Sequence, residues 1–218
     1  MNIIDASYEI LSELDKNKIY KQIELAARTC YKSEDKITDG SAEKLIKALI
    51  KNKHEAMLEH WSISVKFICD RAIANEIVRH RLASFAQEST RYCLYTNDKF
   101  NNQLTFIKPI QFEYDTSEYY TWKCFCLNAE QTYKDLIEKG ATAEEARIVL
   151  PLCTKTEIVM TANLREWRHF LNLRAADATG KAHIQIKELA VPLLMELHDK
   201  LPELFEDIFQ KLPDRGYN

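Results

Sequence analysis

The most regular pattern of hydrophobic and polar positions in this chain is an alternation that begins at residue 61. Its hydrophobic members are Trp61, Ile63, Val65, Phe67 and Cys69. Because successive side chains of a strand point to opposite faces, this period of two predicts a strand over 61–69 with one buried face. The spacing of Ile73 and Ile77 then predicts a short helix over 71–78.

Apolar residues at helical spacing recur along most of the remaining chain. They predict helices over 18–32, 41–51 and 116–139, a shorter helix between Thr142 and Pro151, and largely helical structure over 164–210 with breaks near 179–180 and 202. Asp39 or Ser41 is expected to cap the second of these helices. Extended structure is expected over 85–95 and 153–162. We therefore assign the chain to the α+β class, as a mostly helical single domain over residues 1–218 with a small, largely antiparallel sheet.

Length and charge narrow the class of protein. The chain has 218 residues, of which 46% are hydrophobic and 29% charged, and its net charge is -3. These values are ordinary for one globular domain and argue against coating of nucleic acid by the whole surface. No charged-then-apolar leader and no apolar stretch near the roughly 20 residues of a membrane helix are present. We expect a cytoplasmic protein that neither spans nor binds a membrane.

The cysteines and glycines exclude several familiar sites. The six cysteines form no CxxC pair, and Cys124 and Cys126 are too close in sequence for a common zinc ligand pair. We expect reduced, mostly buried thiols and no metal site. The four glycines form neither GxGxxG nor GxxxxGK. A nucleotide cofactor would therefore be held in some other way.

The segment 79–92 has the most informative composition. It reads Arg-His-Arg-Leu-Ala-Ser-Phe-Ala-Gln-Glu-Ser-Thr-Arg-Tyr. Arginine side chains match phosphate oxygens bidentately, and the hydroxyls, amide and carboxylate of this segment supply further directional hydrogen bonds. A nucleotide is the natural ligand for such a mixture. The alternative is a solvated helix end that is rich in arginine.

A second polar concentration lies over 163–174, within a predicted helix. At about 100° per residue, Arg165, His169 and Asn172 share one face, whereas Arg174 lies roughly opposite Arg165. Both faces carry function only if the helix lies at a subunit interface. The alternative is an exposed amphipathic helix whose arginines are surface residues.

These two segments, with His54 and the pair Glu59-His60, resemble the flavin-dependent thymidylate synthase family. The hallmark of that family is Arg-His-Arg, seven residues, then Ser, which here is Arg79-His80-Arg81 followed by Ser89. Further matches occur in order along the chain at 26–31, 146–151 and 170–174. The resemblance thus spans nearly the whole sequence.

The resemblance implies an activity, cofactors and partners. Members of this family make dTMP from dUMP, with methylenetetrahydrofolate as the carbon donor and an FAD reduced by NADPH as the hydride donor. They have a mixed α/β fold and work as homotetramers whose active sites are shared between subunits. The resemblance therefore implies FAD, NADPH, dUMP and methylenetetrahydrofolate as ligands here, a homotetramer, and no nucleic-acid partner.

The resemblance also assigns roles to individual residues. The residues that match flavin contacts are His54, Arg79, His80, Arg81, Gln87, Asn163, Arg165 and His169. Those that match the nucleotide site are Glu76, Arg79, Gln87, Glu88, Ser89, Thr90, Arg91, Arg147 and Arg174. By the resemblance, Arg174 matches the residue that activates the uracil. An arginine suits this role, because a guanidinium against the N3–C=O edge stabilises the electron-rich ring. A histidine between two arginines is disfavoured in its protonated form, so binding rather than acid–base work is expected of His80.

Three positions depart from the family pattern and keep alternatives open. Ala56 lacks a hydroxyl that often contacts FAD, Glu76 stands where glutamine is usual, and Ala86 stands where asparagine is usual. If these changes abolished FAD binding, the chain would be an inactive paralogue. A non-catalytic module that binds a nucleotide or RNA through the same arginines is the other alternative. The ordered matches favour the enzyme.

Overall fold

The computed structural model describes residues 1–212, and its chain divides into two compact units. Unit 1 comprises 1–7, 66–79 and 85–159, and unit 2 comprises 8–65, 80–84 and the described residues from 160 onward. Four of the strands below have residues in both units, because the boundary falls within them.

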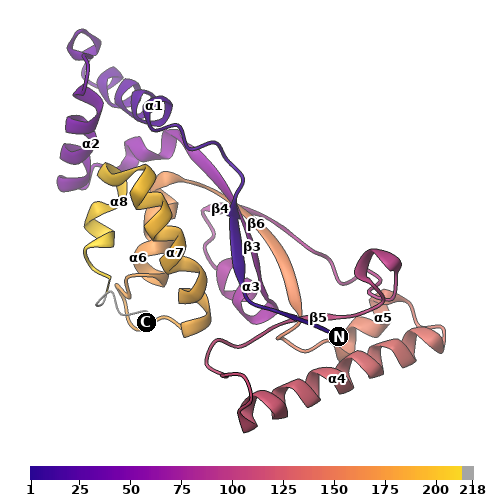
Figure 1. The fold of residues 1–218 in the computed structure, drawn as a ribbon. Coiled ribbons are helices and arrows are strands. Elements are labelled where there is room, and N and C mark those ends of the chain that lie inside the picture. Colours follow the sequence, from indigo (N-terminus) through magenta and orange to yellow (C-terminus); the bar gives the residue numbers. More distant parts are fainter. Residues whose placement is uncertain (213–218) are drawn as a thin grey trace. The chain divides into compact units, whose positions relative to one another are not determined.

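Within residues 1–212, six strands form two small sheets (Figure 1). They are β1 (Asn2–Ile4), β2 (Ser7–Ile10), β3 (Ser62–Asp70), β4 (Ala83–Gln87), β5 (Thr105–Ile107) and β6 (Lys155–Asn163). β1 pairs with β5 in parallel, and the larger sheet has the order β2-β3-β6-β4. At one end of the β3–β6 pair the amide of Leu164 donates to the carbonyl of Trp61, and at the other end the amide of Arg71 donates to the carbonyl of Leu152. This central pair is therefore antiparallel, as predicted.

Helices account for most of the remaining described chain. They are α1 (Lys16–Thr29), α2 (Ser41–Lys51), α3 (Arg71–Ile77), α4 (Ser117–Glu138), α5 (Ala143–Ala146), α6 (Leu164–Arg174), α7 (Ile184–Lys200) and α8 (Pro202–Phe209), with short 3-10 turns η1 (Glu34–Lys36), η2 (Glu55–His60), η3 (Asp98–Phe100) and η4 (Arg147–Val149). Every predicted helix is present within a few residues of its expected bounds. The α+β assignment is confirmed.

Side chains at the helix starts explain several of these bounds. Thr142 forms a capping box with Glu145 at the start of α5, as the sequence predicted. Asn163 accepts a hydrogen bond from the amide of Glu166 and so caps α6. The expected cap of α2 is wrong. Its N-cap residue is Gly40 with φ +72°, a conformation that glycine adopts without steric cost, and Ser41 is the first helical residue.

The extended segment predicted over 85–95 is only partly correct. β4 ends at Gln87, and the carbonyl of Ser89 then accepts hydrogen bonds from the amides of Tyr92 and Cys93 at 3.2 and 3.0 Å. These bonds close a turn. The regular alternation of side chains expected beyond Gln87 is therefore lost, because a turn rather than a strand presents them.

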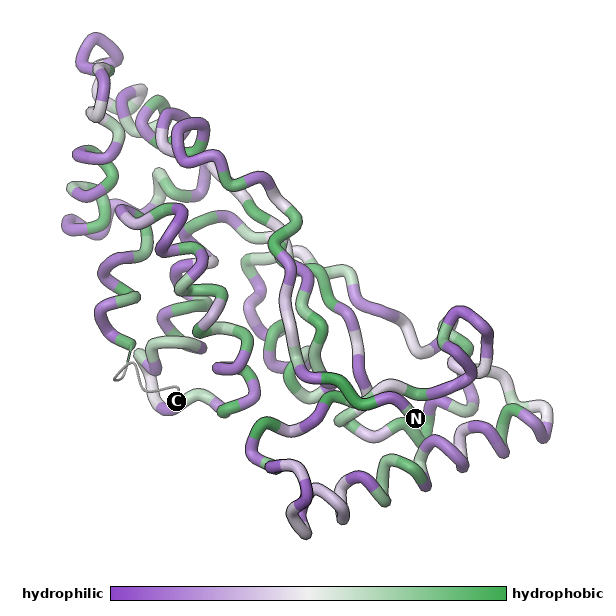
Figure 2. The backbone as a smooth tube through the Cα atoms, viewed as in Figure 1, coloured by the Kyte–Doolittle hydropathy of each residue, from purple (hydrophilic) through white to green (hydrophobic). Residues whose placement is uncertain are grey.

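The predicted buried face of β3 is confirmed, since Ile63, Val65, Phe67 and Cys69 have no exposed surface. In unit 2, the indole nitrogen of Trp167 donates to the carbonyl of Ile63 at 3.1 Å and fastens α6 to this strand. Figure 2 shows hydrophobic and hydrophilic stretches alternating along the helices, as expected of elements with one buried face.

Unit 1 has its own hydrophobic cluster, to which α4 contributes. The cluster contains Tyr95, Leu104, Phe106, Cys126, Tyr133 and Ala146. The cysteine prediction needs a correction, because Cys30 and Cys124 are exposed and only Cys69 and Cys126 are fully buried. All six thiols are free. No helix of the described chain is long and apolar enough to cross a membrane.

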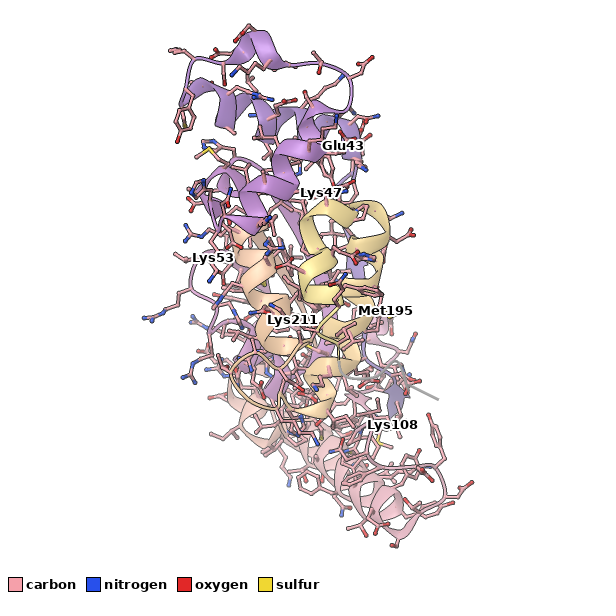
Figure 3. All side chains as sticks on the ribbon, turned by 90° about the vertical axis from the view of Figure 1, so that its left-hand side faces the viewer. Glu43, Lys47, Lys53, Lys108, Met195 and Lys211 are labelled. Atoms are coloured by element: carbon pink, nitrogen blue, oxygen red, sulfur yellow. The ribbon has the colours of Figure 1, made fainter. Side chains whose placement is uncertain are left out.

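The outer side of α2 and α8 in unit 2 is charged. Figure 3 shows Lys47 of α2, Lys53 just after it and Lys211 beyond α8 on this side, and it also labels Met195 of α7 there. The lysines are exposed. This surface is a solvated helix face rather than a packed one.

Arg168 joins α6 to two neighbouring elements of unit 2. Its side chain is 5% exposed and donates to Asp207 of α8 at 2.8 and 2.9 Å, to Glu55 of η2 at 3.1 and 3.2 Å, and to the carbonyl of Leu204. Arg168, the most deeply buried arginine of α6, thus anchors this helix to its neighbours. Removing it would leave two carboxylates without their shared cation.

We expect Arg168→Ala to lower the free energy of unfolding by about 3 kcal/mol, because breaking a buried ion pair leaves uncompensated charges. Denaturant unfolding measures this loss. Arg165→Ala is the matched control on the same helix, since Arg165 pairs with Glu59 at the surface and its removal should cost less than about 1 kcal/mol. Equal losses in the two variants would contradict the anchoring role.

Candidate functional site

A buried polar cluster in unit 2 surrounds His80, which is 6% exposed. The residue follows α3 and packs against α6, where Glu166, Phe170 and Arg174 recur every four residues and so share one face. Nε2 of His80 accepts a hydrogen bond from Nε of Arg174 at 3.1 Å, and its Nδ1 lies 3.4 Å from Oε1 of Glu166. The edge-to-face ring of Phe170, with centroids 4.9 Å apart, completes the enclosure.

These contacts define the protonation state of His80. Nε of an arginine always carries a hydrogen, so the Nε2 that accepts it must present a lone pair. In the neutral ring the proton then resides on Nδ1, on the side of Glu166. Burial lowers the pKa of His80 to about 4, and the charges of Arg174 and His169 add to this effect. The predicted preference for the neutral form is confirmed, but burial is its main cause.

His80, Glu166 and His169 are the one group of three in the described chain whose ligand atoms are close enough to hold a metal ion, within 4.8 Å of one another. Nε2 of His80 already accepts from the guanidinium of Arg174. A divalent cation would have to displace this bond and then share the cluster with the arginine's positive charge. The arrangement therefore suits a chain of polar contacts from Glu166 through His80 to Arg174 better than a metal centre.

The other predicted flavin residues of unit 2 lie mostly at its surface. Arg165 donates to Glu59 at 2.6 Å, with both side chains about half exposed. The side-chain oxygen of Asn163 serves as the helix cap of α6. His54, Arg81 and His169 are exposed. Unit 2 thus presents cationic or hydrogen-bonding side chains near the start of α6 and beside η2.

Unit 1 carries most of the predicted nucleotide residues, beginning at the end of β4. Gln87 donates to the hydroxyl of Thr156 at 3.3 Å. Glu88 accepts from the hydroxyl of Tyr95 at 2.8 Å and from Lys155 at 2.9 Å. Gln87, Glu88 and Lys155 line a cavity of about 450 Å³. The carboxylate of Glu88 is therefore already engaged by two donors.

The turn after β4 presents the hydroxyl of Ser89 and the guanidinium of Arg91. The hydroxyl of Ser89 accepts from the amide of Arg91 at 3.3 Å, and Nε of Arg91 lies 2.9 Å from Glu144 of α5. Thr90 is buried, whereas Arg79 and Arg147 are exposed and Glu76 is half-buried. Because Glu88 is held by other donors, it is poorly placed to activate Ser89 as a nucleophile. A ligand-binding role for Ser89 remains our prediction.

Sequence reasoning missed Glu166, Lys155 and Tyr95. Glu166 follows Arg165 in the polar helix, and its spacing of four and eight residues from Phe170 and Arg174 is the signal that could have placed it beside them. No comparable signal identifies Lys155 or Tyr95. Lys155 contacts Glu88 from 67 residues away in sequence, and Tyr95 contacts it across the turn that follows β4.

A family model described as thymidylate synthase complementing protein matches residues 13–203. A flavin-dependent thymidylate synthase of Pyrococcus furiosus is 34% identical over 166 residues, which cover 76% of this chain and 66% of that protein. Another, from Geobacter sulfurreducens, is 30% identical over 192 residues, which cover 85% and 80%.

A solved structure has the same fold. It is a UMP/dUMP methylase, PolB from Streptomyces cacaoi, bound with 5-Br dUMP, with a TM-score of 0.78 and 22% identity. The match covers 97% of this chain and 98% of that one. By contrast, this chain spans just under two thirds of the length of the first curated relatives that it matches.

The buried imidazole predicts a pH dependence of stability. The unfolded chain protonates His80 near its ordinary pKa of 6.5, whereas the folded chain does so only near 4. Between these values the unfolded state binds more protons, so the free energy of unfolding falls as the pH falls, by about 3 kcal/mol from pH 7 to pH 4. Glu166, whose pKa burial raises, acts in the opposite direction.

A comparison of the wild type with His80→Gln isolates the contribution of His80 to this pH dependence. The variant lacks the imidazole, but Glu166 stays buried, so its opposing contribution is present in both proteins. Denaturant unfolding at pH 7, 5.5 and 4.5 measures the contribution of His80. We expect the wild type to lose more stability on acidification than the variant. Parallel losses in the two proteins would show that His80 protonates normally in the folded state.

Proposed function

Because this chain belongs to the thymidylate synthase complementing protein family, the flavin-dependent thymidylate synthases, we propose that it catalyses the reductive methylation of dUMP to dTMP. The observation that carries this proposal is Arg174, the matched uracil-activating residue, fastened through Nε to the central histidine of the hallmark. A module that only binds nucleotides has no need for such an oriented guanidinium. The bound 5-Br dUMP of the methylase with the same fold supports dUMP as the substrate.

We propose FAD as the cofactor, with NADPH as its reductant. The residues that would hold FAD are His54, Arg79, His80, Arg81, Gln87, Asn163, Arg165 and His169. The donor chemistry fits, because Arg79, Arg81 and Arg165 are exposed guanidinium groups and such groups pair bidentately with the oxygens of a pyrophosphate. When bound, the flavin supplies the hydride, and the protein supplies orientation and electrostatics.

The nucleotide residues have complementary chemistry. Those proposed to hold dUMP are Glu76, Arg79, Gln87, Glu88, Ser89, Thr90, Arg91, Arg147 and Arg174. Ser89 and Arg91 lie on the turn after β4, where a hydroxyl and a guanidinium can both bind a phosphate. The remaining polar side chains suit the sugar and the base.

Arg174 has the central chemical role in this proposal. Carbon 5 of uracil is a weak nucleophile, and it gains reactivity when the pyrimidine carries negative charge on its N3–C=O edge. The planar guanidinium stabilises that form by pairing with adjacent ring atoms. Methylenetetrahydrofolate is the proposed carbon donor. The carbon reaches uracil without covalent attack by Ser89.

The proposal extends to the assembly and setting of the protein. We propose that residues 1–218 act as one synthase domain, that the active form is a homotetramer with shared active sites, and that it acts in the cytoplasm. Size-exclusion chromatography with light scattering tests the tetramer directly. A monomer with full activity would contradict shared sites.

Visible absorption spectra of the purified protein, reconstituted with FAD where needed, test the reaction. We expect flavin bands that bleach anaerobically with NADPH and return when dUMP and methylenetetrahydrofolate are both added, with dTMP as the product. A protein that binds dUMP but no FAD would support the alternative of a non-catalytic nucleotide-binding module. Binding of RNA alone would support the RNA-binding form of that alternative.

We expect Arg174→Ala to retain FAD but to lower kcat for dTMP formation by about 1,000-fold, since one oriented electrostatic group commonly contributes this much. Arg174→Lys is the matched control. It keeps the charge without the planar fork, so we expect it to remain far below wild type. Product formation is measured by chromatography of dTMP. Wild-type turnover in either variant would refute the role of the guanidinium.

Ser89→Ala removes one hydroxyl from the proposed nucleotide site. We expect the Kd for dUMP to rise about 10-fold, because a hydrogen bond to a charged group contributes about 1.5 kcal/mol, with a smaller change in kcat. Isothermal titration calorimetry measures the Kd. Complete loss of turnover with an unchanged Kd would instead indicate a nucleophilic serine.

A further inference from the structure

We propose that Glu166 and His80 are positioning residues, which together orient the guanidinium of Arg174 in unit 2. This inference rests on the proposed function and deepens it. Neither residue needs to touch the pyrimidine for this role. The chain runs from the carboxylate of Glu166 to Nδ1 of His80, and from Nε2 of His80 to Nε of Arg174.

The bond to Nε determines the orientation of the arginine. A guanidinium is planar, so an acceptor fixed at Nε restrains the plane and the direction of the edge formed by the two terminal nitrogens. That edge is the part that pairs bidentately with a ligand. An arginine side chain otherwise loses rotamer entropy when it adopts one geometry. Fixing Nε beforehand reduces this cost in the complex.

His80 is itself held in place. It is 6% exposed, its ring lies edge-to-face against Phe170, and the ring of His169 lies 5.8 Å away. An imidazole ring enclosed in this way has little freedom to rotate. The position of its Nε2, and therefore that of Nε of Arg174, is set by the packing of α6.

Glu166 selects the tautomer that this geometry requires. The alternative tautomer of His80 carries its hydrogen on Nε2, where it would face the hydrogen on Nε of Arg174. A carboxylate oxygen 3.4 Å from Nδ1 favours the tautomer with the hydrogen on Nδ1. Glu166 is only 5% exposed, and a carboxyl group buried to that extent costs stability compared with an apolar residue. A positioning role accounts for its presence on this buried face.

Nuclear magnetic resonance of the ring nitrogens in the protein without flavin or substrate tests the chain directly. We expect neutral His80 to carry its hydrogen on Nδ1 at pH 7, and Glu166→Gln to reduce that preference. This readout does not depend on activity. A hydrogen on Nε2 in the wild-type protein would overturn the proposal.

Kinetics of the holoenzyme test the consequence for Arg174. We expect His80→Leu to lower kcat for dTMP formation by about 100-fold, the effect of a misplaced catalytic group, and Glu166→Gln to lower it by about 10-fold. His80→Gln supplies an amide oxygen near the position of Nε2, so it should recover most of the loss in His80→Leu. Failure of His80→Gln to exceed His80→Leu, when both are folded and bind FAD, would contradict the inference.

Glu24→Gln is the matched control for the loss of a buried carboxylate. Glu24 is 2% exposed and pairs with Arg28 at 3.0 Å within α1, and it is not among the residues proposed to bind FAD or dUMP. We expect it to lower the thermal midpoint without lowering kcat. If Glu24→Gln and Glu166→Gln lower kcat equally, the effect of Glu166 is one of general stability and the inference fails.

The outcomes separate this inference from the proposed function. A wild-type protein that makes no dTMP refutes the proposed function, whatever the tautomer of His80. A wild-type protein that makes dTMP while His80→Leu and Glu166→Gln stay within twofold of it refutes only the positioning role.

Discussion

The hydrogen bond from Arg174 to His80 is the interaction on which the proposed site of unit 2 depends. It joins the end of α6 to the hallmark segment that follows α3, two parts of the chain that are 94 residues apart in sequence. The bond is partly buried, and the ring of Phe170 encloses His80, so this polar contact is stronger and an unmatched polar atom more costly than at the surface. Any change that moves α6 relative to His80 therefore moves the guanidinium as well.

This arrangement assigns His80 to structure and electrostatics rather than to proton transfer. Burial holds its pKa near 4, so at neutral pH the ring stays uncharged and keeps a lone pair for Arg174. A general acid or base would instead have a pKa closer to the working pH. The hydride and carbon chemistry belong to the proposed flavin and folate, and the protein contributes position and field.

Local sequence patterns predicted the helices and strands well, but they could not predict contacts between residues that are far apart in sequence. The alternation from Ile63 to Cys69 specified the buried face of β3, and Thr142 specified the start of α5, because both signals depend on neighbours in sequence. The turn after Gln87 was missed, since Ser89 gives no strong turn signal. The resemblance marked Arg174 as functional, but it could not show that His80 lies beside it or that Glu166 lies behind His80.

Arg168 and Arg174 lie on the same helix, and the contacts described here differ in charge. Arg168 is bound by two carboxylates, Glu55 and Asp207, which neutralise it and tie it to neighbouring elements. Nε of Arg174 donates instead to His80, whose imidazole is neutral. A neutral acceptor fixes the direction of a guanidinium without cancelling its charge. A carboxylate in the place of His80 would orient Arg174 equally well but would weaken its attraction for an electron-rich pyrimidine.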